Sequence, residues 1–145
     1  MLAAAVMVCV AGAARAQAPA PAKAGRTLKV KLNYGGAGVV DEKHKIFLFV
    51  FDAPDFIQRE DAMPIGTGFA SAKDGTITVS DLATSPVYLV AVYDPAGNYD
   101  GMSKPPAGCS LAIYAKSGSE PAPIAIEPGK TVQVDLPFDD SFKMP

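Results

Sequence analysis

Residues 87–93 read VYLVAVY and carry no charged or amide side chain. A second run, Ile46–Phe51, is apolar at every position. Short apolar runs bounded by turn-forming residues are typical of buried strands, and successive side chains of a strand point to opposite faces. The sequence therefore predicts two strands that are apolar on both faces. Because a plain two-layer sandwich buries only one face of each sheet, the outer face of these strands needs a further cover.

The chain after residue 26 alternates short apolar patterns with turn-forming residues. Further strands are predicted around the following centres: Leu28, Phe69, Ile77, Leu111, Ile124 with Ile126, and Val132. The segment 124–126 is flanked by prolines, which cannot donate to a ladder, so it is expected at a sheet edge. About eight short strands without an amphipathic helix predict an all-β, antiparallel sandwich. We place this single domain at residues 27–138 and a C-terminal tail at residues 139–145.

The N-terminal segment has the pattern of a secretory signal peptide. Residues 1–14 are small and apolar, and Ala14-Arg15-Ala16 fits the small-x-small pattern of a cleavage site. We predict a signal peptide at residues 1–16 and a secreted or periplasmic protein. A membrane anchor is the alternative, but a spanning helix needs about 20 apolar residues, so no transmembrane segment is expected after cleavage. Residues 17–26 are rich in Pro and Ala and predict an extended leader.

The charge and cysteine content narrow the range of partners. The chain has 13 Lys and Arg, one of them Arg15 in the predicted signal, against 15 Asp and Glu. No basic stripe appears, so we do not expect a nucleic-acid partner. Cleavage of the signal would remove Cys9 and leave Cys109 alone, so no internal disulfide is expected. We expect Cys109 to be buried as a small apolar side chain, and a thiol open to intermolecular pairing is the alternative.

Residues 74–94 resemble part of a known type of domain. The segment 74–82 reads DGTITVSDL and the segment 87–94 reads VYLVAVYD. A strand that begins after a glycine and ends in a leucine, followed by a short turn and a tyrosine that opens the next strand, is similar to the paired strands of carboxypeptidase regulatory-like, transthyretin-like (prealbumin-like) domains. The strand at 45–52 and the closing segment 127–136 resemble further parts of that family. The chain departs from the family at Ser85-Pro86, where Pro-Gly is usual.

The resemblance implies a fold and a broad role. The fold would be an Ig-like or prealbumin-like antiparallel β-sandwich of about seven to eight short strands. Members of this group serve as accessory, binding or spacer modules more often than as enzymes. A shared fold does not by itself establish a shared function.

The densest group of oxygen ligands follows the 87–93 run. Asp94, Asn98 and Asp100 offer the hard oxygen atoms that calcium prefers. The EF-hand pattern is incomplete, because Ala96 stands where the first ligand would be and no bidentate glutamate follows. We predict no resident cofactor, with calcium at these three residues as the candidate ligand. Turn formation is the alternative explanation, since Asn, Asp and Gly favour turns for backbone reasons alone.

The aromatic side of the Ile46–Phe51 run is the second candidate site. Phe47, Phe49 and Phe51 are expected to share one face of the strand. If that face were uncovered, it would mark an interaction surface for an envelope protein, a glycan or a second copy of the chain in a homodimer. The alternative is a cover from within the chain, by residues 53–64 or 102–108.

The sequence contains no pattern of catalytic residues. His44 is the only histidine and lies in the charged segment DEKHK. No nucleophile elbow, metal-binding histidine pair or dinucleotide fingerprint is present. We therefore predict an exported, non-catalytic binding or accessory module of the cell envelope, acting through protein, glycan or self-association. A small hydrolase or metal-dependent enzyme with a loop-built site is one alternative, and a structural spacer without a ligand is another.

Overall fold

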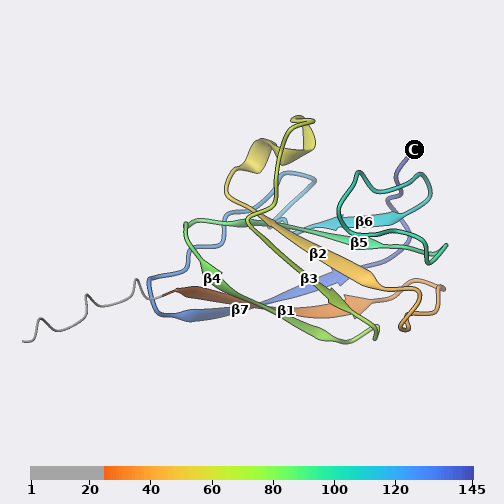
Figure 1. Cartoon of the computed structure of the whole chain (residues 1–145), viewed down its shortest axis with the longest axis horizontal. Helices are drawn as coiled ribbons and strands as arrows, with labels where there is room; N and C mark the ends of the chain where they lie inside the picture. The colour runs from red at the N-terminus through yellow and green to blue at the C-terminus, as the bar shows by residue number, and fades with distance from the viewer. Residues whose placement is uncertain (1–24) are drawn as a thin grey trace, which may run out of the picture.

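Two β-sheets pack face to face in the described part of the chain (Figure 1). The computed structural model describes residues 25–145. One sheet has the strand order β4-β1-β7 and the other the order β3-β2-β5-β6. The elements are β1 (Arg26–Tyr34), β2 (Ile46–Phe51), the 3₁₀ helix η1 (Pro54–Ile57), β3 (Gly66–Ala70), β4 (Thr76–Leu82), β5 (Tyr88–Tyr93), β6 (Ser110–Ile113) and β7 (Thr131–Phe138). The predicted all-β sandwich is confirmed.

Four of the five strand pairings are antiparallel, and the fifth joins the first and last strands in parallel. β1 and β7 pair from Thr27↔Thr131 to Tyr34↔Phe138. The sequence motif suggested β4 and β5 as a strand pair, and this is wrong. β4 pairs with β1, whereas β5 pairs with β2 and β6 in the opposite sheet. The short connection 83–87 therefore crosses from one sheet to the other.

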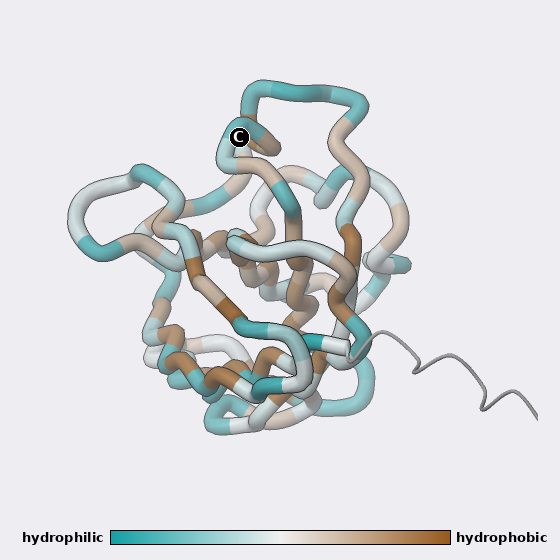
Figure 2. The backbone as a smooth tube through the Cα atoms, turned by 90° about the vertical axis from the view of Figure 1, so that its left-hand side faces the viewer, coloured by the Kyte–Doolittle hydropathy of each residue, from teal (hydrophilic) through white to brown (hydrophobic). Residues whose placement is uncertain are grey.

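The space between the sheets is filled by alternate side chains of each strand. In β2, Ile46, Leu48 and Val50 are completely buried there, and β5 contributes Leu89 and Ala91 in the same way. This alternation matches the prediction for both apolar runs. Figure 2 shows the apolar residues recurring along the strands, with the loops mostly hydrophilic. Full burial of one large aliphatic side chain contributes about 1.5–3 kcal/mol, so this core is the main source of stability.

β3 packs closely against β4 because it presents glycines to it. A Cβ atom at Gly66 would lie 2.6 Å from Cγ1 of Val79, and one at Gly68 would lie 2.4 Å from Cγ2 of Ile77. Side-chain carbons do not approach this closely without displacing one another. β3 of one sheet can therefore approach β4 of the other sheet on this side because positions 66 and 68 carry no side chain.

The segment around Ile124 departs from the prediction. Ile124 and Ile126 do not form an edge strand, and the segment makes only an isolated antiparallel bridge, Val87↔Ile124. Both isoleucine side chains are nevertheless buried in the core. The prolines at 121, 123 and 128 account for the difference, because each lacks an N–H and interrupts a ladder.

The predicted signal peptide, residues 1–16, and residues 17–24 of the predicted leader lie outside the described residues. Arg26, the last residue of that predicted leader, begins β1. Its guanidinium donates hydrogen bonds to the backbone oxygens of Ile126 and Ala83, at 2.8 and 2.9 Å. Across residues 25–145 no helix has the length and apolar character needed to cross a membrane.

We expect Gly68→Ala to lower the free energy of unfolding by about 1–3 kcal/mol, the usual cost of overpacking a core. Gly35→Ala is the matched control, because the nearest atom to its new Cβ would be the backbone oxygen of Phe138 at 3.9 Å, an ordinary contact. Chemical denaturation of both variants measures the difference. Equal stability of the two variants would contradict the close approach of β3 to β4.

Candidate functional site

The outer face of the four-stranded sheet carries a second, smaller apolar cluster. Phe49, Val90 and Val92 are buried on this face together with Cys109. Phe47 and Phe51 lie on the same face and are half-buried. The three phenylalanines therefore lie on one face of β2, as predicted. Other side chains of the chain cover most of that face.

The cover comes from three other parts of the chain. Phe56 of η1 stacks on Phe51, with ring centroids 4.4 Å apart and an angle of 6° between the planes. Tyr99 meets Phe47 edge to face, at 5.0 Å and 76°. Met144 packs against the same cluster from the C-terminal tail. The alternative of an intrachain cover is thus present: residues 53–64 supply Phe56, whereas residues 102–108 add no apolar side chain to this cluster. The contributions of Tyr99 and Met144 were not anticipated.

The C-terminal tail is bound to the start of β6 by backbone hydrogen bonds. Leu111 N donates to Phe142 O at 2.9 Å, Met144 N to Cys109 O at 2.8 Å, and Gly108 N to Met144 O at 3.0 Å. These bonds hold Met144 on the outer face and help to bury Cys109, which is a free cysteine. Burial raises the pKa of the Cys109 thiol, which makes it a weak nucleophile.

The acidic turn after β5 uses its carboxylates to hold its own backbone. Asp94 is buried, and its two oxygens accept hydrogen bonds from Ala96 N at 2.9 Å and Tyr99 N at 2.7 Å. Oδ1 of Asp100 accepts from the backbone of Met102 and Ser103, and these bonds lower the pKa of Asp100. Hydrogen bonds from the backbone to nearby Asp side chains are typical of turns, so turn formation accounts for both carboxylates.

The calcium prediction rested on Asp94, Asn98 and Asp100, and the structure gives it no further support. Asn98 is exposed. Within residues 25–145, no three His, Cys, Asp or Glu side chains converge as a metal site would require. Calcium binding at this turn stays a prediction.

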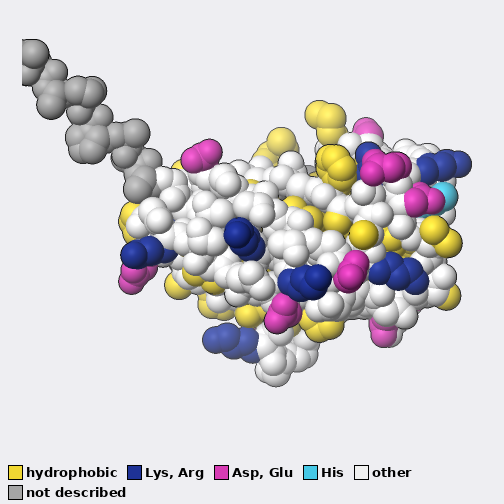
Figure 3. All heavy atoms as spheres, turned by 90° about the horizontal axis from the view of Figure 1, so that it is seen from below, with side chains coloured by type: hydrophobic (Ala, Val, Ile, Leu, Met, Phe, Trp, Pro, Cys, Tyr) yellow, Lys and Arg dark blue, Asp and Glu magenta, His cyan; other side chains and the backbone are white. Residues whose placement is uncertain are grey.

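His44 pairs with a carboxylate of its own turn. Its Nδ1 atom lies 2.9 Å from Oδ1 of Asp41, which also accepts hydrogen bonds from the backbone N–H groups of Lys43 and His44. Hydrogen bonds from His44 lower the pKa of Asp41. This is the geometry of a stabilised turn, with the imidazole oriented by Asp41. Figure 3 shows acidic and basic side chains intermixed over this face of the molecule.

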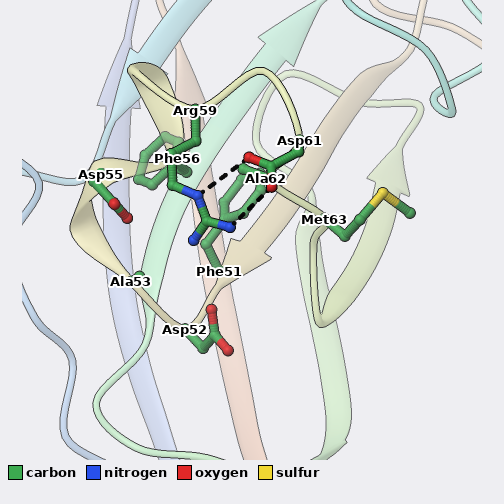
Figure 4. Close-up of a pocket in the computed structure, with 9 residues that line it drawn as sticks. All are labelled: Phe51, Asp52, Ala53, Asp55, Phe56, Arg59, Asp61, Ala62 and Met63. Carbon is green, nitrogen blue, oxygen red and sulfur yellow. Dashed lines mark hydrogen bonds and ion pairs between the residues drawn. The ribbon is translucent and has the colours of Figure 1, made fainter.

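A small depression of about 230 Å³ lies beneath the η1 loop (Figure 4). The stacked rings of Phe51 and Phe56 line it, and Arg59 and Asp61 form an ion pair across it with both N···O distances at 3.3 Å. This pair is solvent-exposed, and exposed pairs contribute little to stability. The depression is therefore a by-product of the loop that carries Phe56 onto the sheet.

A larger groove of about 570 Å³ lies on the outer face beside β3. Phe47, Phe69 and Tyr99 provide its aromatic surface. Phe69 pairs with Phe47 across β3 and β2 and is 57% exposed. Charged side chains surround the rings: Glu42, Lys43, Lys45 and Asp100. Residues 25–145 leave this part of the outer face open.

A partly buried polar network at one end of the sandwich was missed by sequence reasoning. Oδ1 of Asp140 accepts hydrogen bonds from the hydroxyls of Tyr34 and Ser110, both at 2.6 Å, and these bonds lower the pKa of the carboxyl. The Tyr34 ring also contacts Tyr93, with centroids 4.7 Å apart. The network joins the ends of β1, β5, β6 and β7. Its members lie far apart in the sequence, so no pattern of neighbouring residues indicates that they meet.

Comparison with known proteins gives no relative. No protein-family model matches the chain, and neither the curated proteins nor the solved structures contain a match.

We expect Asp140→Asn to lower the free energy of unfolding at neutral pH. The difference from the wild-type protein should become smaller at acid pH. A carboxyl with a lowered folded pKa stabilises the fold above its unfolded pKa of about 3.9, and that contribution is lost as the pH falls through the folded value. Denaturation of both proteins between pH 7 and pH 3 measures the difference. Asp135→Asn is the control, because Asp135 lies in the preceding strand β7 with an exposed side chain. A deficit of constant size across this range would contradict the role of the ionised carboxylate.

Proposed function

We propose that this chain is an exported, non-catalytic binding or accessory module of the cell envelope. It would contact its partner through the open groove on the outer face of the four-stranded sheet. The partner classes that we consider are an envelope protein, a glycan and a second copy of the chain.

The observation that carries this proposal is the exposure of Phe69 beside a covered aromatic face. Phe49 on the same face is 7% exposed, whereas Phe69 is 57% exposed. Exposed apolar surface next to charged side chains is typical of interaction sites. We therefore narrow the predicted surface from Phe47, Phe49 and Phe51 to Phe47 with Phe69.

We also propose membership of the carboxypeptidase regulatory-like, transthyretin-like group, on the residue pattern at 74–94 and not on a β4–β5 strand pair, which the structure lacks. Leu82, which ends the first strand of that motif, is buried between the sheets as the motif would require. The enzyme alternative predicts a pocket at which His44 or two carboxylates converge. Two carboxylates, Glu42 and Asp100, do line the groove, but its lining includes no histidine, serine or cysteine, and His44 is hydrogen-bonded to Asp41 of its own turn. The spacer alternative assigns no role to the groove that Phe47, Phe69 and Tyr99 line.

Export is tested by expressing the full chain in a Gram-negative host. We expect the protein in the periplasmic fraction with the intact mass of residues 17–145, because the cleavage pattern ends at Ala16. Mass spectrometry of the fractions measures this. The uncleaved chain recovered only from the cytoplasm would contradict export.

Binding is tested by co-sedimentation of the exported protein with isolated cell envelopes of its source organism. We expect Phe69→Ala to reduce the bound fraction about fivefold or more, the loss typical of one interface anchor. Phe142→Ala is the matched control, because Phe142 is 59% exposed but lies on the tail beside β6, at the opposite edge of the sheet. Light scattering on the same samples tests self-association.

The proposal fails if the wild-type protein does not sediment with envelopes and is also monomeric. It fails equally if Phe69→Ala and Phe142→Ala have the same effect.

A further inference from the structure

We infer that the groove on the outer face binds a neutral glycan. The inference rests on the proposed function and specifies its ligand class. Three features of the groove carry it: an open aromatic surface, unpaired hydrogen-bonding groups of both kinds, and a balance of charge.

The aromatic surface of the groove is held rigidly. Tyr99 stands nearly perpendicular to Phe47, and its hydroxyl donates a hydrogen bond to Ser103 O at 2.6 Å. Gly101 has φ +73°, and a Cβ there would lie 2.9 Å from the Phe47 ring, so only glycine lets the turn pack this closely. The ring of Phe69 lies across from Phe47 at the sheet edge. Phe47 and Tyr99 therefore form a fixed apolar surface, and Phe69 extends it at the sheet edge with the ring face that Lys45 does not cover. The C–H face of a sugar can stack on these rings.

The charged groups around the rings offer both donors and acceptors. Lys43 and Lys45 belong to neither of the ion pairs among residues 25–145. The Lys45 ammonium makes a cation–π contact over the Phe69 ring, 4.4 Å from its centroid, which places its N–H donors beside that ring. Glu42 and Asp100 each have one carboxylate oxygen engaged, by Ser71 and by the Ser103 turn, which leaves the second oxygen of each for a ligand. Sugar hydroxyls both donate and accept, so they match such a mixed set.

The charge balance separates a neutral glycan from charged polymers. Two carboxylates and two ammonium groups line the groove, so neither an anionic nor a cationic chain gains a net attraction there. Protein partners place their anchoring side chains in enclosed, water-free pockets. This groove is open to solvent, which suits a ring stacked flat on an aromatic surface better than an inserted side chain.

The test uses Phe69→Trp, which introduces the sole tryptophan of a chain that has none. The probes are four neutral oligosaccharides that have a vicinal diol in every ring: cellohexaose, maltohexaose, xylohexaose and mannohexaose. We expect at least one of them, at millimolar concentration, to change the tryptophan emission saturably. In the wild-type protein the same sugar should shift the amide resonances of Phe47, Phe69 and Tyr99. Phe69→Ala should weaken binding about 10-fold, with Phe142→Ala unchanged.

Two outcomes would overturn the inference. One is that none of the four sugars changes the emission or shifts these resonances. The other is that binding occurs but is the same in Phe69→Ala as in the wild type.

A second arm separates failure of this inference from failure of the proposed function. Envelopes are treated either with periodate, which oxidises sugar diols, or with protease before co-sedimentation. We expect periodate to abolish Phe69-dependent sedimentation and protease to leave it. If protease abolishes it and periodate does not, the binding module stands and the glycan inference is wrong. If no Phe69-dependent sedimentation exists in untreated envelopes, both are wrong.

Discussion

The structure depends on one constraint: β2 and β5 lie side by side at the centre of a sheet and are apolar on both faces. Burial of one face against the β4-β1-β7 sheet leaves Phe47, Phe49, Val90 and their neighbours without cover. Exposure of so many apolar side chains is unfavourable, at roughly 25 cal/mol for each Å² left in water. The loops that follow β2 and β5, together with the C-terminal tail, supply the missing layer. The molecule is thus a sandwich with a partial third layer made of single side chains.

This constraint gives the acidic turn after β5 a structural role. The buried carboxylate of Asp94 accepts hydrogen bonds from Ala96 N and Tyr99 N, and this fixes the turn in place. Tyr99 then lies against Phe47 and Phe49, where burial and the nearby Asp100 raise the pKa of its hydroxyl to about 12. The residues that resembled a cation site therefore position an aromatic cover. The same turn forms one wall of the groove in which we place the ligand.

The parts of the fold that could be predicted from sequence are those that depend on the pattern of neighbouring residues along the chain. The alternation within β1, β2, β4 and β5 predicted which side chains face the core, because a strand has a period of two residues. Contacts between distant residues could not be read in this way. The parallel pairing of β1 with β7 and the hydrogen bond from Tyr34 to Asp140 join residues that no local pattern links. The groove was only half anticipated, since Phe47 was a candidate but Phe69, on a short edge strand, was not.

The central claim is that side chains from residues 25–145 cover most of the outer face and leave the groove open. Paramagnetic relaxation by a soluble gadolinium chelate measures this directly, through the aromatic and methyl proton resonances of the wild-type protein. The ring protons of Phe69 should relax strongly, while those of Phe49 and the methyl protons of Val92 should relax as little as those of Leu48 in the main core. Equal relaxation of Phe49, Val92 and Phe69 would show that the third layer is absent in solution and would contradict the claim.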